Sequence, residues 1–184
     1  MASTINATTS SGIVATADNT GQLQLQSAGT TVMTITSTGV TTQVGAPAFS
    51  AYVNNAQSIP STSWTVVAYN TELFDTNNNY NSSTYRFTPT VAGYYQINAT
   101  LSPSSSTITS NNNAMSIWKN GTEFIRGAGF AVSSGNLYMQ VSGIVSFNGT
   151  TDYIEILMFQ TSAGTLTTQT GTFCNFNGCF LRSL

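Results

Sequence analysis

The stretch from Tyr69 to Ala99 constrains the fold of this chain more than any other, because its aromatic and glycine positions recur at fixed intervals. Residues 87–97 read Phe-Thr-Pro-Thr-Val-Ala-Gly-Tyr-Tyr-Gln-Ile. This order predicts a strand that ends near Phe87, a turn through Pro89 and Gly93, and a second strand whose side chains alternate between two faces. A chain organised around such a unit is expected to be a β-protein.

The composition agrees with an all-β chain. Hydrophobic residues make up 40% of the sequence and charged residues only 5%, against roughly 25% charged residues in ordinary soluble domains. The abundant threonines and aromatics favour strands, and the abundant Asn, Gly and Ser favour turns. We predict strands near Phe49–Val53, Ser63–Tyr69, Tyr85–Thr88, Gly93–Leu101, Ala114–Lys119, Thr122–Gly127, Asn136–Phe147, Tyr153–Gln160 and Phe173–Leu181.

Two Asn-Gly pairs mark the clearest turns. Asn120 and Gly121 stand between two alternating apolar runs, which is the strongest short hairpin signal known for a β-protein. Asn148 and Gly149 precede a further apolar run and give a second such signal. Many strands joined by short polar turns predict a sandwich or jelly roll.

The first 45 residues differ from the remainder, since no aromatic residue occurs before Phe49. Short alternating pieces such as residues 23–25 and 32–35 lie between turn signals and are too short to enclose a core. We therefore predict an extended, β-rich N-terminal arm over residues 1–45 and a globular domain over residues 46–184. The arm must pair with another chain, pair with a second copy of itself, or stay mobile.

Cys174 and Cys179 are the two cysteines, and the sequence leaves two arrangements open. A hairpin would bring them close enough to bridge, whereas a straight strand would place them on opposite faces. We favour two reduced, buried thiols.

No residue set for catalysis is visible. The chain lacks histidine, which is the commonest general base and metal ligand, and its one lysine, Lys119, is expected to be solvated beside a turn. Four basic residues and a net charge of −2 do not suit a nucleic-acid partner, and no apolar run is long enough to span a bilayer. We predict a protein that is not an enzyme and has no cofactor. Calcium at the Asn-rich loop after Asp75 is the one ionic alternative.

The spacing of Tyr69, Asp75, Tyr80, Phe87 and Gly93, followed by positions 95, 97 and 99, resembles the signature of the C1q/TNF-like jelly-roll family. The ending Phe-Asn-Gly-Cys-Phe-Leu at residues 176–181 is similar to the closing strand of that family. The resemblance implies a jelly-roll sandwich of about ten strands that assembles as a homotrimer around a three-fold axis. On this basis we place the trimer interface at Tyr95, Ile97, Tyr138, Met139, Val141 and Phe180, with Tyr138 and Met139 on opposite faces.

Residues 12–26 resemble a segment common at the N-termini of bacteriophage virion proteins. Together the two resemblances imply a structural virion protein, made in the host cytoplasm and placed on the capsid exterior. We expect a trimeric decoration or cement protein whose arm binds the major capsid protein. The alternative is a tail-fibre or receptor-binding head that contacts a host glycan or receptor. The arm residues expected to make the attachment are Ile13, Val14, Leu23, Leu25, Val32 and Ile35.

Overall fold

The computed structural model describes residues 20–43, 45–103, 113–127, 138–162 and 164–184. Its contacts divide the chain into two units, Met1–Val44 and Gly45–Leu184. In the first unit, β1 (Leu23–Ser27), β2 (Thr30–Ile35) and β3 (Thr41–Gln43) form an antiparallel sheet in the order β1-β2-β3. Ile13 and Val14 lie outside the described residues.

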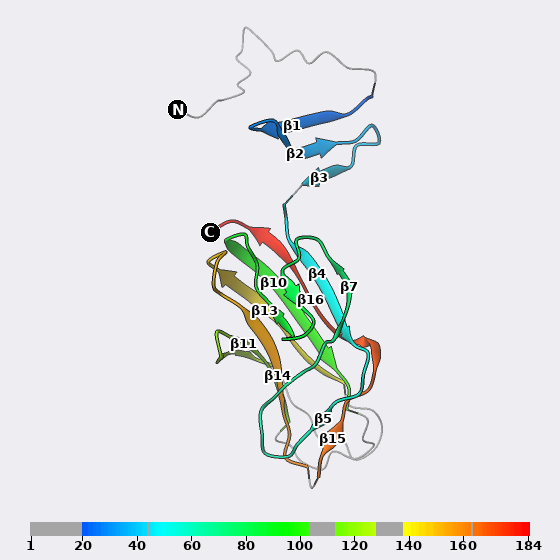
Figure 1. Cartoon of the computed structure of the whole chain (residues 1–184), viewed down its shortest axis with the longest axis vertical. Helices are drawn as coiled ribbons and strands as arrows, with labels where there is room; N and C mark the ends of the chain where they lie inside the picture. The colour runs from blue at the N-terminus through cyan, green and yellow to red at the C-terminus, as the bar shows by residue number, and fades with distance from the viewer. Residues whose placement is uncertain (1–19, 44, 104–112, 128–137, 163) are drawn as a thin grey trace. The chain divides into compact units, whose positions relative to one another are not determined.

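The second unit is a sandwich of two main sheets (Figure 1). The five-stranded sheet has the order β13-β10-β16-β4-β7. Its strands are β13 (Met139–Phe147), β10 (Gly93–Leu101), β16 (Gly171–Arg182), β4 (Ala48–Val53) and β7 (Thr71–Asp75). All of its pairings are antiparallel, and β16 occupies the centre although it is last in the chain.

The six-stranded sheet has the order β12-β11-β14-β9-β8, with β6 paired to β14. Its strands are β12 (Thr122–Arg126), β11 (Ala114–Lys119), β14 (Ile154–Phe159), β9 (Arg86–Phe87), β8 (Tyr80–Asn81) and β6 (Thr65–Val66). A further short ladder joins β15 (Leu166–Thr167) to β5 (Ser58–Ile59). The part of the chain that the structure describes contains no helical segment with the length and apolarity that a bilayer crossing requires.

An aromatic cluster fills the space between the two sheets. Phe49 of β4 stacks on Phe87 of β9 with ring centroids 4.2 Å apart, and it meets Phe176 of β16 edge to face at 4.9 Å. Tyr95 packs against both Phe87 and Phe147 at 5.7 and 5.1 Å. The recurrent aromatic positions of the sequence are therefore the core of the sandwich, where large rings bury the most apolar surface.

Buried tyrosine hydroxyls fasten this core to the backbone. The Tyr80 hydroxyl donates to the Tyr69 carbonyl at 2.6 Å, and the Tyr95 hydroxyl donates to the Val91 carbonyl at 2.8 Å. Burial raises the pKa of Tyr69 and Tyr80 well above the usual range, and it raises the pKa of Tyr95 to about 12. Each phenol is therefore held neutral, because a phenolate here would lose its hydration.

One glycine of β16 shows how closely the sheet packs on this core. A Cβ at Gly178 would lie 2.7 Å from Cδ1 of Ile97 and 2.9 Å from Cε1 of Phe49. The absence of a side chain at this position lets the Phe49 ring lie directly over the central strand.

The predicted strands are largely confirmed. Gly93–Leu101 and Ala114–Lys119 have the predicted bounds, and Asn120 and Gly121 turn the β11–β12 hairpin with φ of 52° and 77°, as a type I′ turn requires. The strand predicted over Ser63–Tyr69 is wrong, since only β6 forms there. The side chain of Gln57 occupies two backbone groups that a longer strand could pair. It donates to the Val66 carbonyl at 2.7 Å and accepts from the Ala68 backbone N–H at 2.8 Å.

The cysteines lie on one straight strand, β16, and are free thiols. Cys174 is buried and Cys179 is exposed, so the prediction of two buried thiols is wrong for Cys179. The two cysteines are five positions apart, and an odd separation along a strand places two side chains on opposite faces.

Candidate assembly interface

The outer face of the five-stranded sheet is the candidate site, and alternation along β10 defines it. Tyr95, Ile97, Ala99 and Leu101 point inward and are fully buried, so the intervening residues point outward. The register then aligns Asn98 with Ser142 of β13 on one side and with Asn177 of β16 on the other. The outward side chains of three adjacent strands therefore form one continuous row.

Side-chain amides connect this face. The Gln96 amide donates to Asn98 Oδ1 at 3.1 Å and to the Ser142 hydroxyl at 3.2 Å. The Asn98 amide donates to Asn177 Oδ1 at 3.1 Å, and the Asn177 amide donates to Asn175 Oδ1 at 2.8 Å. We call these five residues the amide row. Each side chain in it satisfies the next, so the row is held in one arrangement before any partner arrives.

Exposed apolar side chains surround the amide row. Ile144 is 56% exposed on β13, and Tyr94 and Leu181 are exposed on the adjoining strands. At the other end of the sheet, Tyr138 and Phe173 are both exposed and meet edge to face at 6.4 Å. Rings and branched aliphatic side chains around a polar centre provide contact area that a second protein surface can cover.

Charge is distributed unequally between the two sheets. β4, β10 and β13 contain no charged residue, and β16 has only Arg182 at its last position. The edge strand β7 carries the two carboxylates of this sheet, Glu72 and Asp75. The three ion pairs among the described residues all involve strands of the six-stranded sheet or the turn that leads into it. They are Arg86–Glu155 at 2.9 Å, Lys119–Asp152 at 3.0 Å and Arg126–Glu123 at 2.5 Å.

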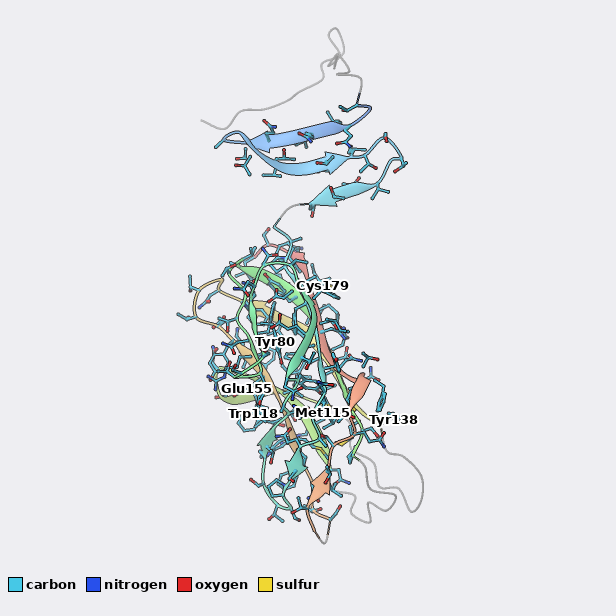
Figure 2. The ribbon with its side chains drawn as sticks, turned by 45° about the vertical axis from the view of Figure 1, so that its right-hand side comes forward. Tyr80, Met115, Trp118, Tyr138, Glu155 and Cys179 are labelled. Atoms are coloured by element: carbon cyan, nitrogen blue, oxygen red, sulfur yellow. The ribbon has the colours of Figure 1, made fainter. Side chains whose placement is uncertain are left out.

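The outward faces of β4, β10 and β13 therefore differ chemically from the six-stranded sheet. Glu155 and Trp118 lie on one side of the sandwich, and Tyr138 lies on the other (Figure 2). The cores of protein–protein interfaces are depleted in charged residues, because a buried charge loses hydration. The adjacent strands β13, β10, β16 and β4 therefore offer a nearly uncharged surface, while the two carboxylates of this sheet lie on its edge strand, β7.

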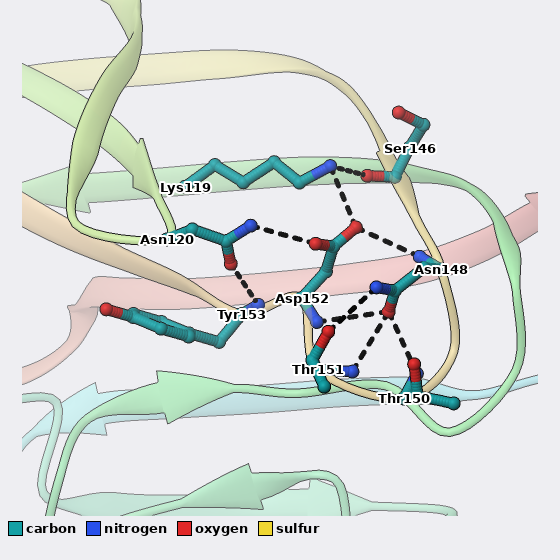
Figure 3. A network of polar contacts seen from close by, with 8 residues as sticks. All are labelled: Lys119, Asn120, Ser146, Asn148, Thr150, Thr151, Asp152 and Tyr153. Atoms are coloured by element: carbon teal, nitrogen blue, oxygen red, sulfur yellow. Dashed lines mark hydrogen bonds and ion pairs between the residues drawn. The ribbon is translucent and has the colours of Figure 1, made fainter.

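The Lys119–Asp152 pair belongs to a polar network that joins the two Asn-Gly turns (Figure 3). Asp152 Oδ1 accepts from the Asn120 amide at 2.8 Å, and Oδ2 accepts from the Asn148 backbone N–H at 3.0 Å. The hydrogen bond from Asn120, followed by those from Lys119 and Asn148, lowers the pKa of Asp152. Lys119 also donates to the Ser146 carbonyl at 2.6 Å.

This network fixes the end of β13, the strand that carries Ile144. It also corrects the expectation that Lys119 is solvated, because its side chain is only 19% exposed and is paired with Asp152. The sequence could not reveal this pairing, since the two residues are brought together by two separate turns.

Four of the six predicted interface residues are not available to a neighbour. Tyr95, Ile97, Met139 and Val141 are at most 2% exposed and pack inside a single subunit. The prediction rests on apolar character, but on a half-buried strand the apolar residues are the ones that face inward. Phe180 also packs against the core, while Tyr138 is 56% exposed and lies opposite Met139 as predicted.

The Asn-rich loop after β7 serves its own backbone. Asp75 Oδ1 accepts from the Asn77 amide N–H at 3.2 Å, and Oδ2 accepts from the Tyr80 N–H at 2.6 Å. This is an Asx-type turn closed by Asp75. The Asn79 side chain also bonds the backbone here, donating to the Asn77 carbonyl at 3.1 Å and accepting from the Thr90 N–H at 3.3 Å. Among the described residues, no three Asp, Glu, Cys or His side chains cluster as a metal site would require.

Comparison with solved structures gives the class of fold. The globular domain of zebrafish complement 1qA matches with a TM-score of 0.55 and 19% identity, over 76% of this chain and 99% of that one. Murine APRIL matches with a TM-score of 0.56 and 13% identity, over 74% of this chain and 99% of that one. The globular unit is therefore a C1q/TNF-like jelly roll, and the predicted fold is confirmed.

A third match extends over more of the chain. The vertex protein P5 of PRD1 matches with a TM-score of 0.53 and 12% identity, over 94% of this chain and 87% of that one. Coverage of this extent takes in part of the segment before Gly45 as well as the jelly roll. No protein-family model matches the sequence, and no curated protein matches it.

Proposed function

We propose that this chain is a homotrimeric structural protein of a virus particle, and that it decorates and stabilises the capsid from outside. The observation that carries the trimer is the nearly uncharged outer face of β13, β10, β16 and β4, with its prearranged amide row and exposed apolar rim. Three copies packed through this face would leave the charged sheets toward solvent. The similarity to a vertex protein of PRD1 supports placement on a particle.

Attachment is assigned to the arm, residues 1–45, with the major capsid protein as its partner. β1 and β3 are edge strands of the arm sheet, and an edge strand offers unpaired backbone groups to a strand of another protein. Three arms on one trimer would engage several capsid subunits at once, and this multivalency strengthens binding without new contacts.

Deletion of residues 1–44 tests the assignment of the arm. The globular unit has its own core, so the truncated protein should remain folded and trimeric. It should no longer join particles when it is mixed with particles that lack the protein. Incorporation at the level of the full chain would contradict the assignment.

A receptor-binding head at a vertex or tail fibre is the second candidate, and the vertex-protein match favours it. Its partner would be a host glycan or receptor. Copy number separates the two candidates, because a cement protein coats the whole lattice whereas a fibre or vertex protein occupies a small set of positions. Quantitative gel densitometry of purified particles, with the major capsid protein as internal standard, gives that number.

A further inference from the structure

The arm sheet has one apolar face that no residue between 20 and 43 covers. The register pairs Leu23 with Ile35 and Leu25 with Met33, and directly opposed residues point to the same side of a sheet. Leu23, Leu25 and Ile35 are 48%, 40% and 36% exposed. The neighbours in sequence point the other way.

The opposite face is polar. Gln24 and Thr34 are opposed on it, and Thr42 of β3 continues the row. On the other side β3 places Thr41 beside Ile35 and Gln43 beside Met33, so the apolar surface belongs to β1 and β2. Residues 20–43 contain no charged side chain. A sheet with one apolar and one polar face is stable when a second layer covers its apolar side. Three short strands do not supply that layer themselves.

We infer that the covering layer is the same face of two further copies of this chain, so that three arm sheets form a three-sided stalk with Leu23, Leu25, Met33 and Ile35 inside. The inference rests on the trimer in the proposed function. A three-fold axis presents identical faces to one another, so leucine meets leucine and isoleucine meets isoleucine at equal height. The polar Gln/Thr faces are then turned to water.

Charge and tethering both favour copies of the same chain as the layer that covers the apolar face. The arm sheet at residues 20–43 has no charged side chain, so it has no electrostatic means to select a different partner, and its copies do not repel each other. Only residues 44–47 separate β3 from β4, and β4 belongs to the sheet assigned to the trimer interface. Assembly of the globular units therefore holds three arms at a high effective concentration, on the order of millimolar for short linkers.

The stalk also changes which arm surfaces remain for the capsid. Leu23, Leu25 and Ile35 are withdrawn from attachment, while the backbone edges and the polar face stay available. Val32 lies where the β1–β2 register shifts and is not part of the apolar set.

Photo-crosslinking of the full chain tests the stalk. Leu25→p-benzoylphenylalanine places the probe on the apolar face, and Thr34→p-benzoylphenylalanine is the matched control on the polar face. After irradiation of the purified protein, denaturing gels should show dimers and trimers for the position 25 variant and chiefly monomer for the control. Peptide mapping should join residues 23–35 of one chain to residues 23–35 of another.

Two results would overturn the inference. One is a crosslink from position 25 to residues 45–184, since the apolar face would then lie against a globular unit. The other is a protein that is trimeric by light scattering yet gives equal crosslinking from both positions. In either case the proposed virion function would stand. Conversely, arm-to-arm crosslinks in a protein that is absent from purified particles would support the stalk and reject the virion function.

Hydrogen–deuterium exchange gives a second readout that needs no probe. Amides of residues 23–35 should be protected in the wild-type trimer, and Leu25→Asn with Ile35→Asn should raise their exchange rates at least tenfold. Gln24→Asn with Thr34→Asn, on the other face, should leave the rates near wild type. Rates in the wild type equal to those of the apolar-face variant would reject the stalk.

Discussion

Replacement of Ile144 by aspartate should dissociate the trimer without unfolding the subunit. Ile144 is 56% exposed on the outer face of β13, beside the amide row. Full burial of an isoleucine is worth about 1.5–3 kcal/mol, so covering its exposed half contributes roughly 1 kcal/mol per copy and roughly 3 kcal/mol per trimer. A carboxylate at this position would also lose hydration on an uncharged face.

The size of the effect follows from trimer stoichiometry. A loss of roughly 3 kcal/mol changes the assembly constant by on the order of 100-fold, because about 1.4 kcal/mol corresponds to a factor of ten. The midpoint concentration of a monomer–trimer equilibrium varies with the square root of that constant. We therefore expect the midpoint to rise by at least about tenfold, measured by light scattering coupled to size-exclusion chromatography over a dilution series.

Phe124→Asp is the matched control. Phe124 is 50% exposed on β12 of the six-stranded sheet, so the substitution changes a similar exposed area on the sheet that carries the charges. Its dissociation midpoint should equal that of the wild type, and both variants should keep the wild-type thermal unfolding of the subunit. Equal midpoints for Ile144→Asp and wild type, or a shift for Phe124→Asp alone, would refute the choice of face.

Three predictions concern the stability of the subunit. Burial raises the pKa of Tyr95 to about 12 and raises that of Tyr80 further. The free energy of unfolding should therefore be constant below the unfolded-state pKa of about 10, and above it should fall by about 1.4 kcal/mol per pH unit for each such tyrosine. Urea unfolding from pH 9 to 11 should show a shallower fall for Tyr80→Phe than for the wild type. Gly178→Ala should lower the free energy of unfolding by about 1–3 kcal/mol through overpacking, whereas Gly164→Ala, whose Cβ would meet nothing within 4 Å, should leave it nearly unchanged; equal losses would contradict the packing argument. The lowered pKa of Asp152 gives stability that is present above about pH 4 and is lost as the pH falls through its folded-state value, so acid unfolding of Asp152→Asn should depend less steeply on pH between 4 and 2 than that of the wild type.

The sequence predicted the fold because the fold depends on local chemistry. The alternation that begins at Gly93 and the Asn-Gly pair at residue 120 each specify a strand or a turn within a few residues. β7 was missed since Leu73 and Phe74 are exposed on an edge strand and so break the inward-apolar rule. β6 was overextended because the competing hydrogen bonds come from Gln57, several residues away in the chain.

The proposed interface was less predictable, because it depends on which face of each strand the core leaves exposed. Apolar character selects Tyr95 and Ile97, yet burial in the core uses them within one subunit. A signal was present in the sequence all the same: the strands now seen as β4, β10 and β13 lack any charge, while the other sheet's strands contain several. Charge segregation between strands, rather than apolarity, would have pointed to β4, β10 and β13, although the edge strand β7 of the same sheet carries Glu72 and Asp75.

The amide row explains how such a face can be polar and still favour assembly. Burying a side-chain amide without partners costs free energy, because its hydrogen bonds to water are lost. Within the single subunit, Gln96 already donates to Asn98, Asn98 to Asn177, and Asn177 to Asn175, at distances of 2.8–3.1 Å. Many of the hydrogen bonds that these side chains can make are therefore formed before association. Covering the row breaks few hydrogen bonds to water. The surrounding Ile144, Tyr94 and Leu181 can then provide the net driving force. Asn98→Leu interrupts the row, so it should weaken the trimer although it makes the face more apolar. A stronger trimer in dilution experiments would show that the amide row does not favour assembly.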